Sequence, residues 1–201
     1  MTATHSSAAA AVASNLLTPA ERELAHEHLH QVQAGLTGAI KGLSAAQWNF
    51  APAGKWSISE IVEHVIFVYE LVEGRIREQL SSGPTPEAGR DNALIDAIVI
   101  HQFPARLAKF PAPEISKPSG CYATPAEALA RLAKIQARTA EYIDTAGNLR
   151  QHVLESAPLK AITKGVRTTM DGYQWILAPS AHAERHTKQI LEVRADANFP
   201  V

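Results

Sequence analysis

The stretch 56-WSISEIVEHVIFVYELVEGRIREQL-80 predicts a long amphipathic helix whose start is marked in the sequence. Ser57 is placed to cap the first turn, and Glu60 is placed three residues later to bond back to the backbone of Ser57. The run Ser81-Ser82-Gly83-Pro84 ends the helical pattern. Because its apolar face must be covered, a helix of this kind predicts partner helices.

Three further segments carry apolar residues at helical spacing. The first runs from Pro19 to about Leu43, with an apolar stripe that includes Leu24. The second runs from Pro125 to about Ala146, and both begin with the letters Thr-Pro-Ala-Glu, a cap followed by proline at the first helical position. The last runs from about Asp171 to Ala195, where Pro179 is expected to kink the helix.

The segment 81–123 is rich in proline, and only Asn92 to Gln102 within it looks helical. The nearest candidate for a strand, Gln151 to Leu154, is too short to support one. We therefore predict an all-α protein: a four-helix bundle with a long crossover connection, containing one short helix, between the second and third helices. Residues 1–17 are expected to be a disordered tail, and residues 18–201 the bundle domain.

Composition excludes several classes of partner and environment. The chain carries 19 basic and 20 acidic side chains, a balance that argues against binding nucleic acid through its phosphates. It lacks the run of about 18 apolar residues that a membrane span requires. The single cysteine excludes an intramolecular disulfide and fits a reducing cytoplasm.

Three of the nine histidines are predicted to face the bundle interior. At about 100° per residue, His182 and His186 share a face of the last helix with Trp175 and Ile190. His64 shares a face of the 56–80 helix with apolar residues. Buried neutral imidazoles are costly unless each nitrogen has a partner, and one divalent metal ion would serve all three. The alternative is that they are core histidines, bonded to backbone or to carboxylates.

The other six histidines carry weaker signals, and they are His5, His26, His28, His30, His101 and His152. His101 ends the short crossover helix, so we keep it as an additional ligand or pocket residue. We expect the remaining five on the surface, at the edge of an apolar stripe, in the tail or in a loop.

The residues around these histidines resemble a known family. Trp56-Ser57-x-x-Glu60-x-x-x-His64, followed by His182-x-x-Arg185-His186-x-x-Gln189-Ile190, strongly resembles the DinB-like (YfiT-like) superfamily of bacterial four-helix-bundle proteins. The resemblance extends from roughly Thr18 to Ala195. It implies a divalent metal held by His64, His182 and His186. Members of the family include transferases and isomerases that use low-molecular-weight thiols, which implies a small thiol-linked substrate.

Three histidine ligands leave a coordination position open, which is typical of a catalytic metal site. Imidazole suits both zinc and nickel, and the sequence does not choose between them. The expected function is a metal-dependent thiol S-transferase or hydrolase; the alternative is a non-catalytic, stress-related bundle whose metal or histidine cluster is structural. Glu60, Gln189 and Tyr69 are candidates for the surroundings of the site, with Glu60 also expected as a helix cap. Pairing of an uncovered apolar face would make a homodimer.

Overall fold

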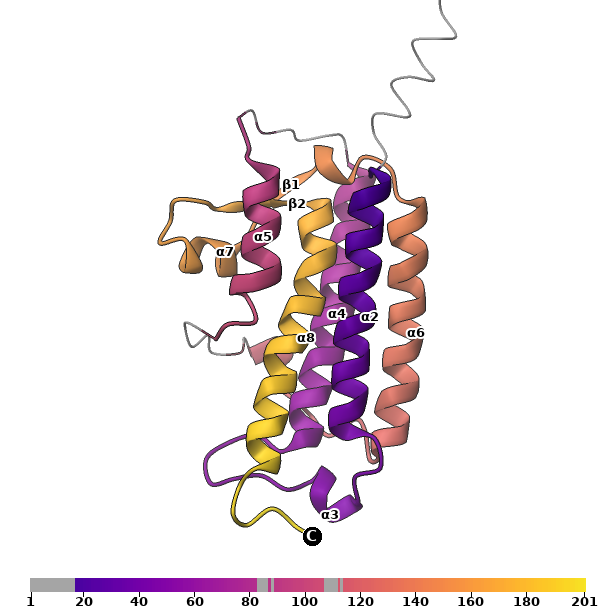
Figure 1. The fold of residues 1–201 in the computed structure, drawn as a ribbon, viewed down its shortest axis with the longest axis vertical. Helices are drawn as coiled ribbons and strands as arrows, with labels where there is room; N and C mark the ends of the chain where they lie inside the picture. The colour runs from indigo at the N-terminus through magenta and orange to yellow at the C-terminus, as the bar shows by residue number, and fades with distance from the viewer. Residues whose placement is uncertain (1–16, 83–86, 88, 107–111, 113) are drawn as a thin grey trace, which may run out of the picture.

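The computed structural model describes residues 17–82, 87, 89–106, 112 and 114–201. Four long helices run side by side as a bundle (Figure 1), which confirms the predicted fold class; they are α2 (Pro19–Ile40), α4 (Ile58–Ser81), α6 (Pro125–Thr145) and α8 (Gly172–Arg194). The crossover between α4 and α6 contains the predicted helix α5 (Asn92–Gln102), which lies against α8. The short elements are α3 (Ala45–Trp48), η1 (Glu114–Ser116), η2 (Leu149–Gln151) and α7 (Ala157–Ile162).

The predicted tail overlaps the described structure at one residue. Residues 1–16 lie outside the described part of the chain, whereas Leu17 is buried in the core. None of the described helices is long and apolar enough to cross a membrane.

The helix starts follow the capping signals in the sequence. The Thr18 hydroxyl accepts a hydrogen bond from the Glu21 backbone N–H, and the Ser57 hydroxyl accepts one from Glu60, each at 3.2 Å. The expected stripe of α2 was wrong at one position: Leu24 is exposed. The buried face passes through its neighbour Ala25, which lies about 100° around the helix from Leu24.

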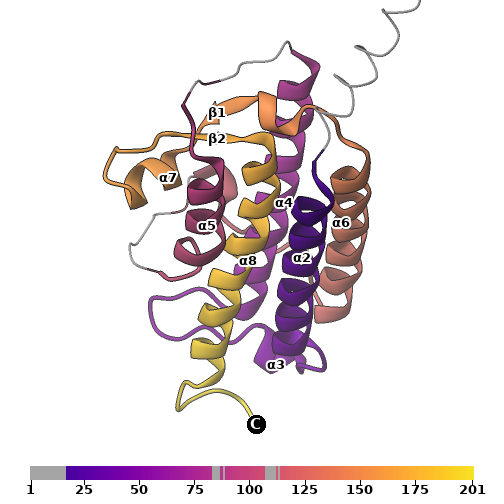
Figure 2. The ribbon, with the colours of Figure 1, turned by 45° about the horizontal axis from the view of Figure 1, so that its top comes forward.

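A small hairpin that the sequence did not predict crosses the N-terminal end of α8 (Figure 2). Strand β1 (Val153–Glu155) pairs in antiparallel fashion with β2 (Thr169–Asp171), so that Val153 lies opposite Asp171. Each strand has three residues, too few for an alternating pattern to be recognised. The connection between the strands contains α7, which packs toward α5.

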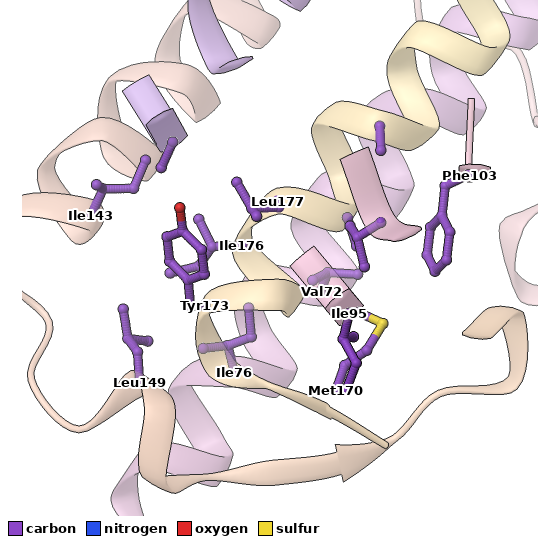
Figure 3. Close-up of a cluster of buried hydrophobic side chains, with 14 of the residues drawn as sticks. Val72, Ile76, Ile95, Phe103, Ile143, Leu149, Met170, Tyr173, Ile176 and Leu177 are labelled. Carbon is purple, nitrogen blue, oxygen red and sulfur yellow. The ribbon is translucent and has the colours of Figure 1, made fainter. Parts of the chain in front are cut away.

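The core divides into two clusters along α8. At the hairpin end, Tyr173, Ile176 and Leu177 of α8 pack with side chains from α4, α5 and β2 (Figure 3). At the α3 end, buried side chains of α2, α4 and α6 surround the second half of α8. Pro179 lies within the hairpin-end part of α8, between Ala178 and Ala181 of that cluster, and α8 continues past it to Arg194. Helices α4 and α8 therefore pack along their lengths, which brings the faces that carry the candidate histidines together.

Candidate metal centre

The three inward histidines meet between α4 and α8. His182 Nε2 lies 3.2 Å from His64 Nε2 and 3.1 Å from His186 Nε2. One nitrogen from each ring fits within 4.8 Å of the others, although His64 is 118 residues from His182 in sequence. The convergence that the helical spacing predicted is therefore present.

Two of the rings have their protonation fixed by neighbours. His64 Nδ1 lies 2.8 Å from the backbone oxygen of Ser116, and His186 Nδ1 lies 2.9 Å from Oε1 of Gln189. Both oxygens only accept hydrogen bonds, so each Nδ1 carries a proton and donates it. In a neutral imidazole the other nitrogen is then a bare lone pair. His64 and His186 both direct this lone pair at His182.

His182 cannot satisfy both neighbours. Its Nε2 carries at most one proton, which serves one lone pair and leaves the other facing an electron-rich nitrogen. Its Nδ1 is buried and has no hydrogen-bond partner among the described residues. The cluster is therefore short of positive charge at its centre, whichever tautomer His182 adopts.

A divalent cation fits this deficit. Nitrogen ligands 2.0–2.1 Å from a tetrahedral zinc ion lie about 3.3 Å from one another. The two Nε2 separations of 3.1 and 3.2 Å are close to that value. The donor set is also suitable, because neutral imidazole is a ligand for both zinc and nickel.

The surroundings keep the imidazoles neutral. Burial lowers the pKa of His64, brings the pKa of His186 to about 3, and places the pKa of His182 well below its usual range. The neighbouring rings and the charge of Arg185 lower the pKa of His182 and His186 further. The ring of Trp56 covers His64 at a centroid separation of 5.2 Å. Protonation therefore does not compete with a metal ion near neutral pH.

Of the other candidate residues, one contacts the histidine cluster and the rest lie elsewhere in the fold. Gln189 contacts His186 as described, whereas the Glu60 carboxylate accepts from the Ser57 backbone N–H at 2.7 Å and serves the helix cap. The Tyr69 hydroxyl lies 3.2 Å from Ser180 Oγ, and burial raises the pKa of Tyr69 to about 12. His101 is exposed and is not part of the group of three.

Two of the remaining histidines are buried. His28 is 6% exposed, in agreement with its place at the edge of the apolar stripe of α2. His152 was expected in a loop; it lies between η2 and β1 and is 2% exposed. The chain crosses the end of α8 at this point, where the His152 carbonyl accepts a hydrogen bond from Gly172 N–H. His5 lies outside the described residues.

The sequence interpretation missed a carboxylate next to the site and a cluster of charges far from it. Glu63, the residue before His64, is 9% exposed and accepts hydrogen bonds from residues 119–121. The sequence signal that could have identified Glu63 was its place between two residues on the buried face of an amphipathic helix, where an acidic side chain needs a partner. The distant cluster is centred on Arg150, and no local spacing indicates it.

Comparison with known proteins agrees with the fold. The sequence model of the DinB superfamily matches residues 28–190. No curated protein matches the chain significantly. Among solved structures, YfiT from Bacillus subtilis, described as a probable metal-dependent hydrolase with an unusual four-helix bundle topology, is similar at a TM-score of 0.57 and 14% identity. The match covers 89% of this chain and 88% of the YfiT chain.

Proposed function

We propose that this chain, which belongs to the DinB superfamily, is an enzyme that hydrolyses a small molecule with one divalent metal ion, zinc or nickel, held by His64, His182 and His186. The observation that carries the proposal is the convergence of three Nε2 atoms, two of them bare lone pairs. The fold-level similarity to YfiT, described as a probable metal-dependent hydrolase, supports the reaction class.

Each ligand has a definite task in this proposal. Ser116 holds His64 and Gln189 holds His186, so that both rings present Nε2 before an ion arrives. His182 stands between them and completes the set. When bound, a divalent ion acts as a Lewis acid and lowers the pKa of water. Three protein ligands leave room for water and for a polar group of the substrate.

A second candidate function is transfer of a low-molecular-weight thiol. The positive charge of Arg185 is close enough to lower the pKa of His182 and His186. A cation at this position also stabilises negative groups on a bound molecule, including a thiolate. This observation favours a substrate or cosubstrate that carries negative charge.

The metal is tested by elemental analysis of protein purified without chelator. We expect about one zinc or nickel per chain in the wild type, and less than a tenth of that in His64→Ala and in His182→Ala. His30→Ala is the matched control, because His30 is an exposed histidine on α2 and its loss should leave the metal content unchanged. A wild-type protein without metal would contradict the proposal.

The reaction is tested on the metal-loaded protein. Hydrolysis of esters, amides or phosphoesters without added thiol supports the hydrolase, whereas turnover only with mycothiol, bacillithiol or glutathione supports the transferase. A non-catalytic bundle with a structural ion predicts a different result, namely a sharp fall in melting temperature on chelation and no turnover in either assay.

A further inference from the structure

We propose that Glu63 is a positioning residue for the metal site: by clamping the backbone of residues 119–121 it holds the Ser116 carbonyl that orients His64. This inference rests on the proposed function, because the purpose it assigns to Glu63 is to present His64 to a metal ion.

The Glu63 carboxylate is bound on both oxygens. Oε1 accepts from the Ser119 backbone N–H at 2.7 Å and from the Ser119 hydroxyl at 2.9 Å. Oε2 accepts from the backbone N–H groups of Gly120 at 2.8 Å and Cys121 at 3.0 Å. Three consecutive N–H groups thus converge on one carboxylate, a curved arrangement that forms an anion-binding nest. Gly120 has φ +87°, a conformation that glycine adopts without strain.

The carboxylate is held in this nest by four hydrogen bonds, three of them from backbone N–H groups. Bonds from backbone N–H groups to an ionised carboxylate are stronger than neutral ones. The contact between α4 and residues 119–121 is therefore a strong local attachment.

The attachment reaches His64 through a short connection. Ser116 lies three residues before Ser119, is 3% exposed, and accepts the hydrogen bond from His64 Nδ1 at 2.8 Å. Pro118 stands between them and restricts its own backbone and that of the preceding residue. Two successive residues of α4, Glu63 and His64, thus hold both ends of one stiff segment.

The geometry of His64 depends on this segment. Only an oxygen at the Ser116 position keeps the proton on Nδ1 and leaves Nε2 as the lone pair toward His182. If residues 119–121 were released, the carbonyl would shift and the imidazole would be free to take the other tautomer. The chain beyond the segment has its own anchor, since Trp48 Nε1 donates to the Tyr122 carbonyl at 3.0 Å. Loss of the clamp should therefore leave the bundle folded.

The experiment compares Glu63→Gln with Glu73→Gln by titration with Co²⁺, which reports affinity and, through its visible spectrum, the ligand field. Glu73 is on the same helix but pairs with Arg77 and Arg138. We expect Glu63→Gln to weaken binding by about 10- to 100-fold and to alter the spectrum, the range found when a residue supporting a metal ligand is removed. Glu73→Gln should match the wild type. Equal affinity and an unchanged spectrum in Glu63→Gln would overturn the inference.

A pair of glycine variants tests the clamp without touching Glu63. Gly120 and Gly165 have φ +87° and +83°, and an added Cβ meets nothing within 4 Å at either position. Alanine is strained at both, so the two variants should lose similar stability. Only Gly120→Ala should weaken Co²⁺ binding. Equal Co²⁺ affinities in Gly120→Ala and Gly165→Ala would overturn the inference even if Glu63→Gln failed to fold.

The ring ¹⁵N signals of His64 in metal-free protein separate this inference from the metal proposal. We expect the wild type to show the Nδ1–H tautomer and Glu63→Gln to show a mixture of both. If the wild type bound no metal, the proposed function would fail, and these signals would still decide whether Glu63 orients His64. An unchanged tautomer in Glu63→Gln would overturn the inference.

Discussion

Two partly buried polar clusters of this protein differ in whether every polar group has a hydrogen-bond partner. The Arg150 cluster joins α2, α5 and β2 at the hairpin end, where the guanidinium bonds to Glu21, Asp96 and Asp171. These bonds range from 2.7 to 3.0 Å and use all five N–H donors of Arg150. The guanidinium also lies 4.1 Å over the ring of Tyr173. Every donor in this cluster has an acceptor.

The histidine cluster has the opposite balance. Three ring nitrogens face one another with at most one proton among them, and His182 Nδ1 has no partner among the described residues. In a complete polar cluster the hydrogen bonds offset the cost of desolvation, whereas a buried polar group without a partner lowers stability until a partner is supplied. The two clusters therefore differ in whether they need a further partner.

The largest expected effect is the loss of the complete cluster. Arg150→Met leaves three carboxylates without their counter-charge, and the side chain of Asp171 is fully buried. We expect the free energy of unfolding to fall by about 3–5 kcal/mol, as measured by urea denaturation. Arg77→Met, which breaks an exposed pair on α4, should cost less than about 1 kcal/mol. Similar losses in both variants would remove the distinction between the clusters.

Removing the centre of the incomplete cluster should cost much less. His182→Leu removes a ring nitrogen that has no partner, but it also removes the one proton that serves His64 or His186. The two changes offset one another, so we expect the metal-free variant to stay within about 1–2 kcal/mol of the metal-free wild type in urea. The same variant should bind no metal. A loss as large as that of Arg150→Met in the metal-free variant would mean that the cluster is already satisfied.

His28 offers an intermediate case, a single buried imidazole with Nε2 unpartnered. Burial lowers the pKa of His28 below 6.5. The charge of Glu184 raises this pKa and that of His101 lowers it, and burial has the largest effect. The unfolded chain therefore takes up a proton first as pH falls, and stability is lost below about pH 6.5. His28→Leu should reduce the slope of this loss, by at most about 1.4 kcal/mol per pH unit. An unchanged slope between pH 7 and 5 would show that His28 is not buried neutral.

The smallest change in the free energy of unfolding is expected for Tyr69 and Ser180, an uncharged pair joined by a hydrogen bond. Tyr69→Phe removes the hydrogen bond to Ser180 and should cost about 1 kcal/mol in a denaturant titration. Metal content should not change, because the hydroxyl bonds to Ser180. A loss of metal in this variant would instead assign Tyr69 to the metal site.

Sequence periodicity predicted most of the bundle and the site. The short helix begins and ends at the predicted residues, Asn92 and Gln102. His182 and His186 followed from their spacing on one face, and His64 from its apolar neighbours. The hairpin could not be predicted in this way, because each three-residue strand is stabilised by the partner strand rather than by a local pattern.

The sequence by itself determined the four long helices, the short helix α5 and most of the faces that they bury, because capping residues and apolar spacing act within a few turns of chain. Only the tertiary structure decided which polar groups have all their hydrogen-bond partners. Arg150 meets Glu21 across 129 residues, and Glu63 meets Ser119 across 56. A hydrogen bond requires that its donor and acceptor be placed to within a few tenths of an ångström. No local spacing in the sequence encodes that placement between such remote segments. The inward-facing histidines could therefore be predicted from the sequence. That their Nε2 atoms face one another with too few donors could not.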